Sequence, residues 1–277
     1  MIVFPNCKIN LGLNILNKRD DGYHELQSVF YPLPFSDILE IIPQKKSEEK
    51  KTGISLSLSG LDIKTDQKNN LCTKAYHLIK NDFPGMPFVH MHLHKTIPPG
   101  AGLGGGSADG AFTLKLLNQQ FNLGITTEKL MAYALQLGSD CPFFISNQAC
   151  IASGRGELIQ TISLDLSAYK IVLVNPAINI STADAFSLIT PGIPRKSIKE
   201  IIQQPVGLWK NELRNDFEET VFIKFPEIKM IKEQLYEYGA VYASMTGSGS
   251  TIYGLFKKEE TLQLKFTKKY FVKILPC

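Results

Sequence analysis

The sequence predicts an α+β protein made of two domains, residues 1–157 and residues 158–277. Strand patterns dominate the first part before helices take over, which favours an α+β layout over a repeating βαβ one. The second part has the order strand–helix–strand–strand–helix–strand, which is the order of a ferredoxin-like split βαβ unit. A chain of 277 residues is long enough for two compact domains.

Strands are expected along the N-terminal end of the chain. Apolar and polar residues alternate strictly over residues 8–15, which predicts a strand with one buried face. A turn at Asp20-Asp21-Gly22 leads into a second strand. This second strand covers residues 25–33, further strands cover residues 36–42 and 53–61, and a polar, Lys-rich loop covers residues 44–52.

Helical patterns begin at residue 70. Helices are expected over residues 70–79, after Ser107 as far as Phe121, and over residues 128–137, with one more strand over residues 88–96. Thr126 and Thr127 are suitable caps for the third helix, and Gly138 is a residue type that ends helices. The N-terminal domain should therefore combine a mixed sheet with helices.

The C-terminal domain opens with a short apolar strand. A helix should start near Thr182, and a polar, Pro-containing link should follow it. Towards the end of the chain, two strands flank a turn of small residues, and a helix and a last strand complete the unit. The strands are expected over residues 171–174, 241–244, 252–256 and 271–275, the link over residues 190–205, and further helices over residues 218–222 and 227–238.

Composition argues against several classes of protein. The apolar share of 44% and the charged share of 20% are typical of globular proteins rather than disordered or membrane ones. A net charge of +4 is too small to indicate nucleic acid. The N-terminus resembles neither a signal peptide nor a membrane span, and no other stretch is long enough to cross a bilayer. Five scattered cysteines without metal or redox spacing indicate free thiols, so we expect a cytoplasmic protein.

The strongest chemical signal is the glycine-rich segment from Pro98 to Ser107, which reads Pro-Pro-Gly-Ala-Gly-Leu-Gly-Gly-Gly-Ser. Glycine lets the backbone turn sharply and brings amide N–H groups close to an anion. The helix that follows adds unpaired N–H donors and a partial positive charge. A polyphosphate fits that environment. A flexible linker explains it less well, because two prolines stiffen the start of the segment and a strand and a helix bracket it.

Two familiar phosphate-binding loops differ from this segment. A Walker A loop requires Lys directly after its last Gly, and Ser107 stands there. Gly100, Gly102 and Gly105 do satisfy the G-x-G-x-x-G pattern of dinucleotide-binding folds. Those folds continue with a strand that ends in an acidic residue about twenty residues on, whereas here Glu128 lies inside a second helical segment. A nicotinamide-dependent dehydrogenase therefore stays only as an alternative.

Lys8 and Asp140 are the residue types that phosphoryl transfer to an alcohol requires. A carboxylate accepts or orients the hydroxyl proton, and a cation stabilises the migrating charge. Lys8 and Asn10 share one face of the first strand, where a solvated strand face is the alternative explanation. Asp140 stands between a helix and Pro142, where a helix cap is the alternative.

His90, His92 and His94 alternate along one expected strand, a spacing that can bind a metal. No further His, Cys or carboxylate nearby completes a metal site. The apolar residues between the histidines supply the buried face of the strand, so we expect the histidines to face solvent.

These motifs together resemble those of the GHMP kinases, the superfamily of galactokinase, homoserine kinase and mevalonate kinase. The segment from Pro98 to Ser107 is similar to the second motif of that superfamily. Two other motifs occur in order, the strand with Lys8 and Asn10 and the stretch Met-Thr-Gly-Ser-Gly-Ser-Thr at residues 245–251. The branch that phosphorylates a cytidine diphosphate conjugate is matched most specifically, by residues 8–13, 18–25, 138–144, 153–157 and 215–218.

The resemblance implies a two-domain GHMP kinase fold, with ATP and a small-molecule substrate in a cleft between the halves. It implies transfer of the ATP γ-phosphoryl group to the 2-hydroxyl of the methylerythritol moiety of that conjugate, in the non-mevalonate isoprenoid pathway. Asp140 would be the base, and Lys8 would support it and the transferring phosphate. The expected ATP-binding residues are Lys95, Pro99, Gly100, Ala101, Gly102, Leu103, Gly104, Gly105, Gly106 and Ser107, with Ser107 near Mg²⁺. The expected acceptor-binding residues are Asn10, Tyr23, His24, Phe30, Thr182 and Phe186, with His24 at the cytosine.

Two positions depart from the family pattern. Relatives often carry Ser where Ala108 stands and Ala where Gly110 stands, which removes one hydroxyl and weakens the helix by about 1 kcal/mol. Neither change touches Lys8 or Asp140. A GHMP kinase for another alcohol, such as mevalonate or homoserine, and a non-catalytic nucleotide-binding module stay open as alternatives. Nucleic acid and membrane partners are not expected, and a monomer and a homodimer are both compatible with the sequence.

Overall fold

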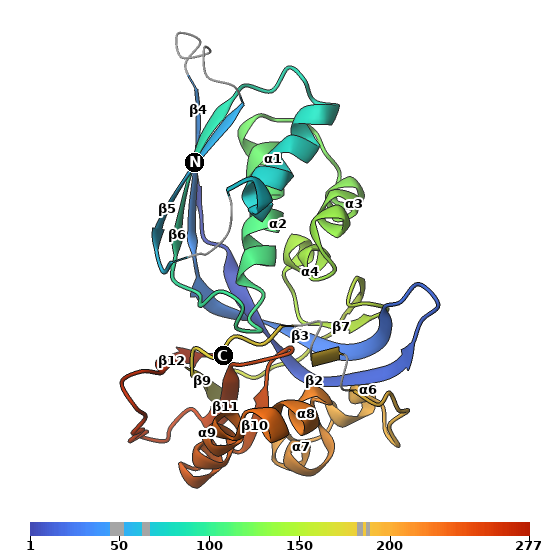
Figure 1. Ribbon diagram of the computed structural model, residues 1–277, viewed down its shortest axis with the longest axis vertical. Coiled ribbons are helices and arrows are strands. Elements are labelled where there is room, and N and C mark those ends of the chain that lie inside the picture. The colour runs from blue at the N-terminus through green and yellow to red at the C-terminus, as the bar shows by residue number, and fades with distance from the viewer. Residues whose placement is uncertain (45–52, 63–66, 182–184, 187–188) are drawn as a thin grey trace. The chain divides into compact units, whose positions relative to one another are not determined.

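The structure, a computed structural model, describes residues 1–44, 53–62, 67–181, 185–186 and 189–277 (Figure 1). The chain forms two compact units, and each unit is assembled from separate stretches of sequence. Unit 1 consists of Met1–Cys7, Phe35–Pro99 and Gly104–Asn147, and unit 2 of Lys8–Pro34, Gly100–Leu103 and Gln148–Cys277. The α+β class is confirmed, whereas the sequence boundary at residues 157 and 158 stays a prediction.

Unit 1 is built on a four-stranded sheet in the order β1-β4-β6-β5. Its strands are Ile2–Val3, Ile38–Pro43, Val89–Lys95 and Ile54–Gly60, in that spatial order. β5 runs parallel to β6 and the other neighbours are antiparallel, so the sheet is mixed, as predicted. Helices α1 (Leu71–Asp82) and α2 (Gly105–Gln120) cover one face of this sheet (Figure 1).

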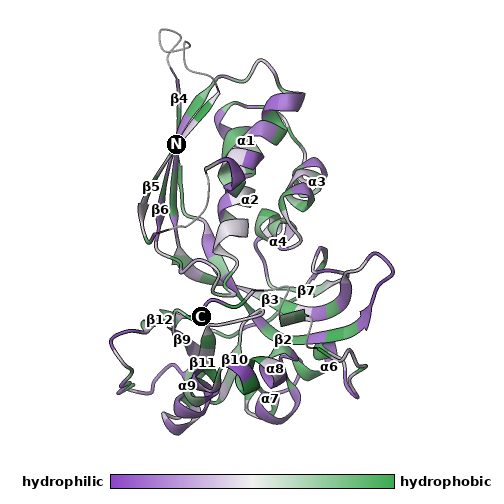
Figure 2. Ribbon diagram, viewed as in Figure 1, coloured by the Kyte–Doolittle hydropathy of each residue, from purple (hydrophilic) through white to green (hydrophobic). Residues whose placement is uncertain are grey.

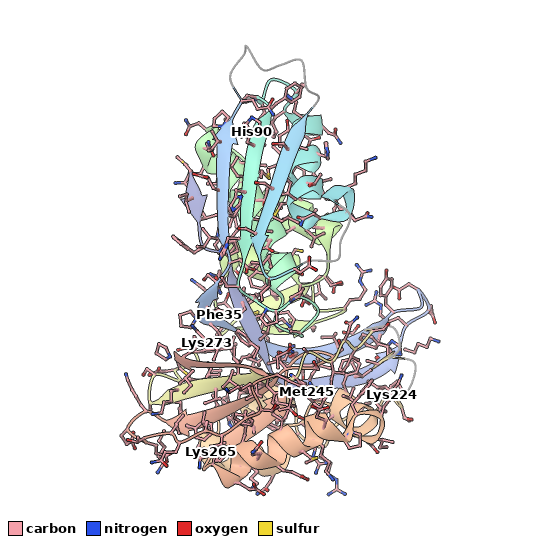
Figure 3. The ribbon with its side chains drawn as sticks, turned by 60° about the vertical axis from the view of Figure 1, so that its left-hand side comes forward. Phe35, His90, Lys224, Met245, Lys265 and Lys273 are labelled. Carbon is pink, nitrogen blue, oxygen red and sulfur yellow. The ribbon has the colours of Figure 1, made fainter. Side chains whose placement is uncertain are left out.

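The other face of the unit 1 sheet carries the three histidines. The residues between them on β6 are buried, as the alternation predicted, and His90 and His92 are exposed (His90 is labelled in Figure 3). Serines of the parallel neighbour β5 bond to each ring, for example Ser57 Oγ to His92 Nδ1 at 2.8 Å. Within the described ranges, no group of three or more His, Cys, Asp or Glu side chains could hold a metal ion.

Two shorter helices complete the helical layer of unit 1. α3 (Thr127–Leu137) begins and ends as predicted, because the Thr126 side chain accepts a hydrogen bond from the Lys129 N–H and Gly138 follows the last turn. α4 (Cys141–Ser146) was not predicted. It is hydrophobic along most of its length (Figure 2), and its first five residues are buried.

A second sheet has the order β2-β3-β7-β8, with strands Asn6–Lys18, His24–Ser36, Cys150–Ser153 and Leu158–Thr161. The first ten residues of β2 are buried without a break, so the prediction of one solvated face is wrong. Lys8 and Asn10 are only 3% and 2% exposed. Sequence alternation could not reveal this because both faces of the strand are covered by tertiary packing.

The C-terminal part of unit 2 holds an antiparallel sheet in the order β10-β11-β9-β12. Its strands are Tyr242–Met245, Ile252–Lys257, Tyr169–Asn175 and Phe271–Pro276. This is the strand order of a ferredoxin-like split βαβ sheet, so the predicted sheet is confirmed. Helices α8 (Phe217–Lys224) and α9 (Pro226–Glu237) lie close to the predicted ranges and contribute to the core of this sheet.

Two predictions for the C-terminal part are wrong. The stretch between β11 and β12 contains turns and coil instead of a helix. Its apolar residues Leu262, Leu264 and Phe266 have a spacing of two, so an extended segment and not a helix packs them against the core. The supposed link contains helix α6 (Ile198–Ile201), and α7 (Val206–Glu212) follows it.

Two further predictions, one in the C-terminal part and one in unit 1, fall wholly or partly on residues that the structure leaves undescribed. The helix start near Thr182 lies outside the described residues, and so does the Lys-rich loop apart from its first residue.

Among the helices of the described ranges, none combines the length and the apolar character that a bilayer crossing requires.

The segment from Asn215 to Glu218 anchors β10 and the turn after it. Asn215 Nδ2 donates to the carbonyl oxygens of Met245 and Gly247, each at 2.8 Å. Glu218 Oε1 accepts from the Met245 N–H at 2.7 Å, and Lys232 Nζ donates to Glu218 Oε2 at 2.6 Å. Glu218 is only 9% exposed, so water cannot solvate its carboxylate fully. The hydrogen bonds from these donors compensate for the lost hydration.

We expect Glu218→Gln to lower the free energy of unfolding by about 2–4 kcal/mol, because it removes the charge that pairs with Lys232 and replaces an acceptor with a donor. Urea unfolding measures the loss. The exposed neighbour Glu219 is the matched control, and Glu219→Gln should change stability by about 0.5 kcal/mol or less. Equal losses for the two variants would contradict the anchoring role.

Candidate active site

The glycine-rich segment connects β6 to α2, and its residues belong to both units. Pro98, Pro99 and the residues from Gly104 onward lie in unit 1, whereas Gly100–Leu103 lies in unit 2.

The part in unit 2 packs against the turn after β10. Thr246 Oγ1 donates to the Gly102 carbonyl oxygen at 3.0 Å, and the Thr251 N–H donates to the Ala101 carbonyl oxygen at 3.3 Å. Gly102 has a φ of 76°, and a Cβ there would lie 2.1 Å from the Thr246 carbonyl oxygen. Only glycine fits this position, because a side chain would meet both backbone strain and a clash.

The part in unit 1 forms the start of α2. Gly104 is the N-cap residue, with a φ of 72°, and it offers no side chain to the first N–H groups of the helix. Gly106 is exposed, and a Cβ there would meet nothing within 4 Å. Unpaired N–H groups and the helix dipole make such a start an anion site, and a glycine that packing does not require leaves room for an approaching ligand.

The turn that carries Asp140 contacts the first turn of α2. Asp140 occupies the N-cap position of α4, but its side chain makes no capping hydrogen bond, so a capping role does not explain this carboxylate. The next residue, Cys141, is buried, which raises its pKa to about 12 although a hydrogen bond with Ser107 opposes the shift. Unit 1 thus brings Ser107 beside the residue that follows Asp140.

Lys95 lies under the start of α2, in a buried cluster. Its Nζ donates to Asp37 Oδ2 and, at 2.7 Å, to Asp109 Oδ2. Burial lowers the pKa of Lys95, but the attraction of the two carboxylates outweighs it and the net shift is upward. Burial also raises the pKa of Asp109 to about 7, against the attraction of Lys95. The prediction that Lys95 binds ATP stays a prediction, and its contacts are with protein carboxylates.

Lys8, Asn10 and Phe30 come together on β2 and β3 of unit 2. Lys8 Nζ donates to Asn10 Oδ1 at 2.6 Å and lies 4.4 Å from the centroid of the Phe30 ring. Asn10 Nδ2 donates to Ser28 Oγ at 2.8 Å, and the Asn10 N–H donates to Thr246 Oγ1 at 3.1 Å. These bonds fix the Lys8 ammonium in one orientation.

His24 and Phe186 form a stacked pair of rings in unit 2. Their centroids are 4.9 Å apart and their planes differ by 19°. Phe186 in turn packs edge-to-face on Phe217 at 4.8 Å. Burial, together with the charge of Lys18, lowers the pKa of His24, which favours a neutral imidazole.

Tyr23 is 53% exposed, and its ring packs under a cation. The guanidinium carbon of Arg155 lies 4.4 Å from the centroid of the Tyr23 ring. Thr182, the remaining expected acceptor residue, lies outside the described residues. Arg155 belongs to the family-like stretch 153–157, and an arginine between two glycines is a local signal for such a contact, although no role for Arg155 is predicted from the sequence.

Two family models match the chain, one in each half of the sequence. The model described as "GHMP kinases N terminal domain" matches residues 70–154, and "GHMP kinases C terminal" matches residues 197–271. Among solved structures, mevalonate kinase of Methanococcus jannaschii superposes with a TM-score of 0.68, covering 100% of this chain and 98% of its own, at 14% identity. The fold is therefore that of the GHMP kinases.

Relatives with higher sequence identity show to which family within the GHMP kinases the chain belongs. A protein of Bacteroides fragilis named 4-diphosphocytidyl-2-C-methyl-D-erythritol kinase is 52% identical over 98% of this chain and 96% of its own length. A protein of the same name from Cytophaga hutchinsonii is 48% identical over 94% of each chain. A crystal structure of 4-(cytidine 5'-diphospho)-2C-methyl-D-erythritol kinase matches with a TM-score of 0.79 and 29% identity, over 92% of this chain and 90% of that one.

The chain therefore belongs to the GHMP kinases and, within them, to the 4-diphosphocytidyl-2-C-methyl-D-erythritol kinase family. The predictions that it is a kinase and that it has the GHMP kinase fold are confirmed. ATP is the phosphate donor that membership of this family implies. The dehydrogenase alternative is wrong.

The two glycines of the segment should respond differently to alanine. Gly102→Ala should lower the free energy of unfolding by about 2 kcal/mol or more, because it combines a left-handed φ with a clash against the Thr246 carbonyl. Gly106→Ala should leave stability unchanged or raise it by up to about 1 kcal/mol, since alanine favours a helix and nothing obstructs its Cβ. Urea unfolding of both variants measures the contrast, and similar stabilities would contradict it.

Proposed function

We propose that this chain transfers the γ-phosphoryl group of ATP to the 2-hydroxyl of 4-diphosphocytidyl-2-C-methyl-D-erythritol. The observation that carries the proposal is the 52% identity, over nearly the whole chain, to a protein named as the kinase for that compound. The buried Lys8, the glycine-rich start of α2 and the stacked aromatic pair support it, because each suits one part of the reaction.

The glycine-rich segment would bind the polyphosphate of ATP. Residues 99–107 supply backbone N–H groups and the positive end of the α2 dipole, which favour a bound anion. Gly106 leaves the surface open where a phosphate oxygen would approach. The Lys95 ammonium would contribute to ATP binding from beneath the start of α2.

Mg²⁺ would be held by the Ser107 hydroxyl together with the phosphates of the nucleotide. The described residues offer no cluster of three or more metal-binding side chains, which suits an ion coordinated mainly by phosphate and water. When bound, the ion neutralises charge on the phosphates during transfer.

Asp140 and Lys8 would carry out the transfer. Asp140 would accept or orient the proton of the 2-hydroxyl as that oxygen attacks the γ-phosphorus. Lys8 would stabilise the charge on the migrating phosphoryl group, because Asn10 and the Phe30 ring hold its ammonium in place. The carboxylate and the ammonium thus have complementary roles in one step.

The aromatic residues would recognise the cytidine end of the acceptor. A flat base can pack on the rings of His24 and Phe186, and Tyr23 adds an exposed ring nearby in the sequence. A neutral His24 carries one donor and one acceptor nitrogen, which allows directional hydrogen bonds to the edge of a nucleobase.

A cytoplasmic location and a monomeric or homodimeric state stay predictions.

The acceptor is tested directly by following ADP formation from ATP and Mg²⁺ with one alcohol at a time. Turnover should occur with 4-diphosphocytidyl-2-C-methyl-D-erythritol and exceed turnover with mevalonate or homoserine by about 1,000-fold or more. The reason is that a site with hydrogen-bonding groups for a nucleobase disfavours compounds that have no nucleobase. Preferred turnover of mevalonate or homoserine would contradict the acceptor. Nucleotide binding without turnover of any acceptor would favour a binding module.

The base role is tested by Asp140→Asn. We expect kcat to fall by about 10²–10⁴-fold, because the amide cannot accept the hydroxyl proton, while the Kd for ATP stays within about threefold. Steady-state kinetics and a nucleotide titration measure the two quantities. Asp62, an exposed carboxylate of the same unit, is the control, and Asp62→Asn should retain normal kcat. Near-normal turnover of Asp140→Asn would remove this residue from the base role.

A further inference from the structure

Lys95, Asp37 and Asp109 form a buried cluster of one ammonium and two carboxylates. The three residues are 3%, 0% and 3% exposed, and each comes from a different part of unit 1. Lys95 ends β6, Asp37 lies between β3 and β4, and Asp109 lies in α2. A buried lysine with two carboxylate partners is costly to desolvate, so its burial is weak evidence for a role in stability.

The contacts of Asp37 reach the backbone that enters the glycine-rich segment. Asp37 Oδ1 accepts from the Thr96 N–H at 2.6 Å and from the Ile97 N–H at 2.9 Å. Its own N–H donates to the Pro5 carbonyl oxygen at 2.9 Å. This carboxylate therefore fixes the two residues that precede Pro98 against the neighbouring strands.

Lys95 lies close to the first residue of α2, Gly105. A Cβ on Gly105 would lie 3.4 Å from Lys95 Nζ, so the ammonium lies directly beneath the helix start. Asp109 stands one turn further along the same helix and accepts from Lys95 Nζ at 2.7 Å. The ammonium thus links the backbone before the segment, through Asp37, to the helix after it, through Asp109.

We propose that Lys95, Asp37 and Asp109 form a clamp that sets the first turn of α2 relative to the end of β6, and that Lys95 is a positioning residue for the ATP phosphates. This inference rests on the proposed use of the glycine-rich segment for ATP. Lys95 acts through the backbone it holds, since two buried carboxylates occupy its ammonium. Without the cation, the two carboxylates repel each other and the helix start moves away from the end of β6.

Isosteric carboxamides separate positioning from direct contact. Asp37→Asn and Asp109→Asn keep Lys95 but weaken the clamp, so each should raise the Kd for a non-hydrolysable ATP analogue by about tenfold or more, as Lys95→Met should. If Lys95 instead bonds the nucleotide directly, Lys95→Met alone weakens binding. The two asparagine variants then bind ATP normally or more tightly, because their ammonium is freer. That pattern would overturn the inference.

Two further measurements distinguish the clamp from a merely structural role. The KM for the acceptor alcohol should stay within about twofold in the asparagine variants, assayed where circular dichroism shows them folded, since only the ATP side is displaced. A parallel rise of both constants would contradict the clamp. The asparagine variants also keep the test decisive if Lys95→Met does not fold.

Lys115 provides the matched control. It is a partly buried lysine of the same helix, and its Nζ donates to the Ile145 carbonyl oxygen at 3.2 Å, away from the glycine-rich segment. Lys115→Met should leave the Kd for the ATP analogue unchanged, and a rise equal to that of Lys95→Met would overturn the clamp. Failure of the unaltered chain to bind the analogue would refute the ATP site itself. Normal binding by that chain and by both asparagine variants would refute only the clamp.

Discussion

The Thr246 hydroxyl joins sequence segments that lie far apart in the chain. It accepts from the Asn10 N–H at 3.1 Å, across 236 positions of sequence, and donates to the Gly102 carbonyl oxygen at 3.0 Å. Asn215 holds the same turn through the carbonyl oxygens on either side of Thr246. The strand of Lys8, the glycine-rich segment and the turn after β10 thus form one buried polar network in unit 2, and the orientation of Lys8 depends on it.

The network also explains why so many polar groups of this chain are buried. Asn10, Ser28 and Thr246 are each at most 2% exposed, which is costly unless every group finds a partner. Their partners lie on different elements, so the bonds form only when the whole unit is folded. In unit 1, Lys95 pairs with two buried carboxylates, whereas Asp109 Oδ1 has no hydrogen-bond partner among the described residues. In both units, buried polar contacts specify the positions of the residues proposed to act on ATP and the acceptor.

Local rules predicted much of the fold. The limits of α3 followed from Thr126 and Gly138, because a cap and a helix-ending glycine depend only on neighbouring backbone groups. Ser197 and Glu200 form a capping box at α6, which is a local signal that the sequence contains. The helix predicted after β11 is wrong because the apolar residues there repeat every two positions, which is the period of an extended segment.

Long-range contacts limited the prediction of the site. Alternation along β2 could not show that Lys8 and Asn10 are buried, because the covering elements come from elsewhere in the chain. The carboxylates of Lys95 are 58 and 14 positions away in sequence, and no spacing rule connects them. The glycine-rich segment was recognisable because its chemistry is local, namely consecutive glycines before a helix. The proposed acceptor rests on likeness to relatives and not on spacing.

Backbone N–H groups of the glycine-rich segment are proposed to bind the phosphates of ATP, and the other proposed roles depend on this binding. Titration of the ¹⁵N-labelled chain with a non-hydrolysable ATP analogue, followed by NMR, tests it most directly. Saturable shifts should be largest for the amides of Gly104, Gly105, Gly106 and Ser107, because an anion deshields the N–H groups that bond to it. Saturable binding with the largest shifts outside residues 98–107 and none at these four amides would contradict the account.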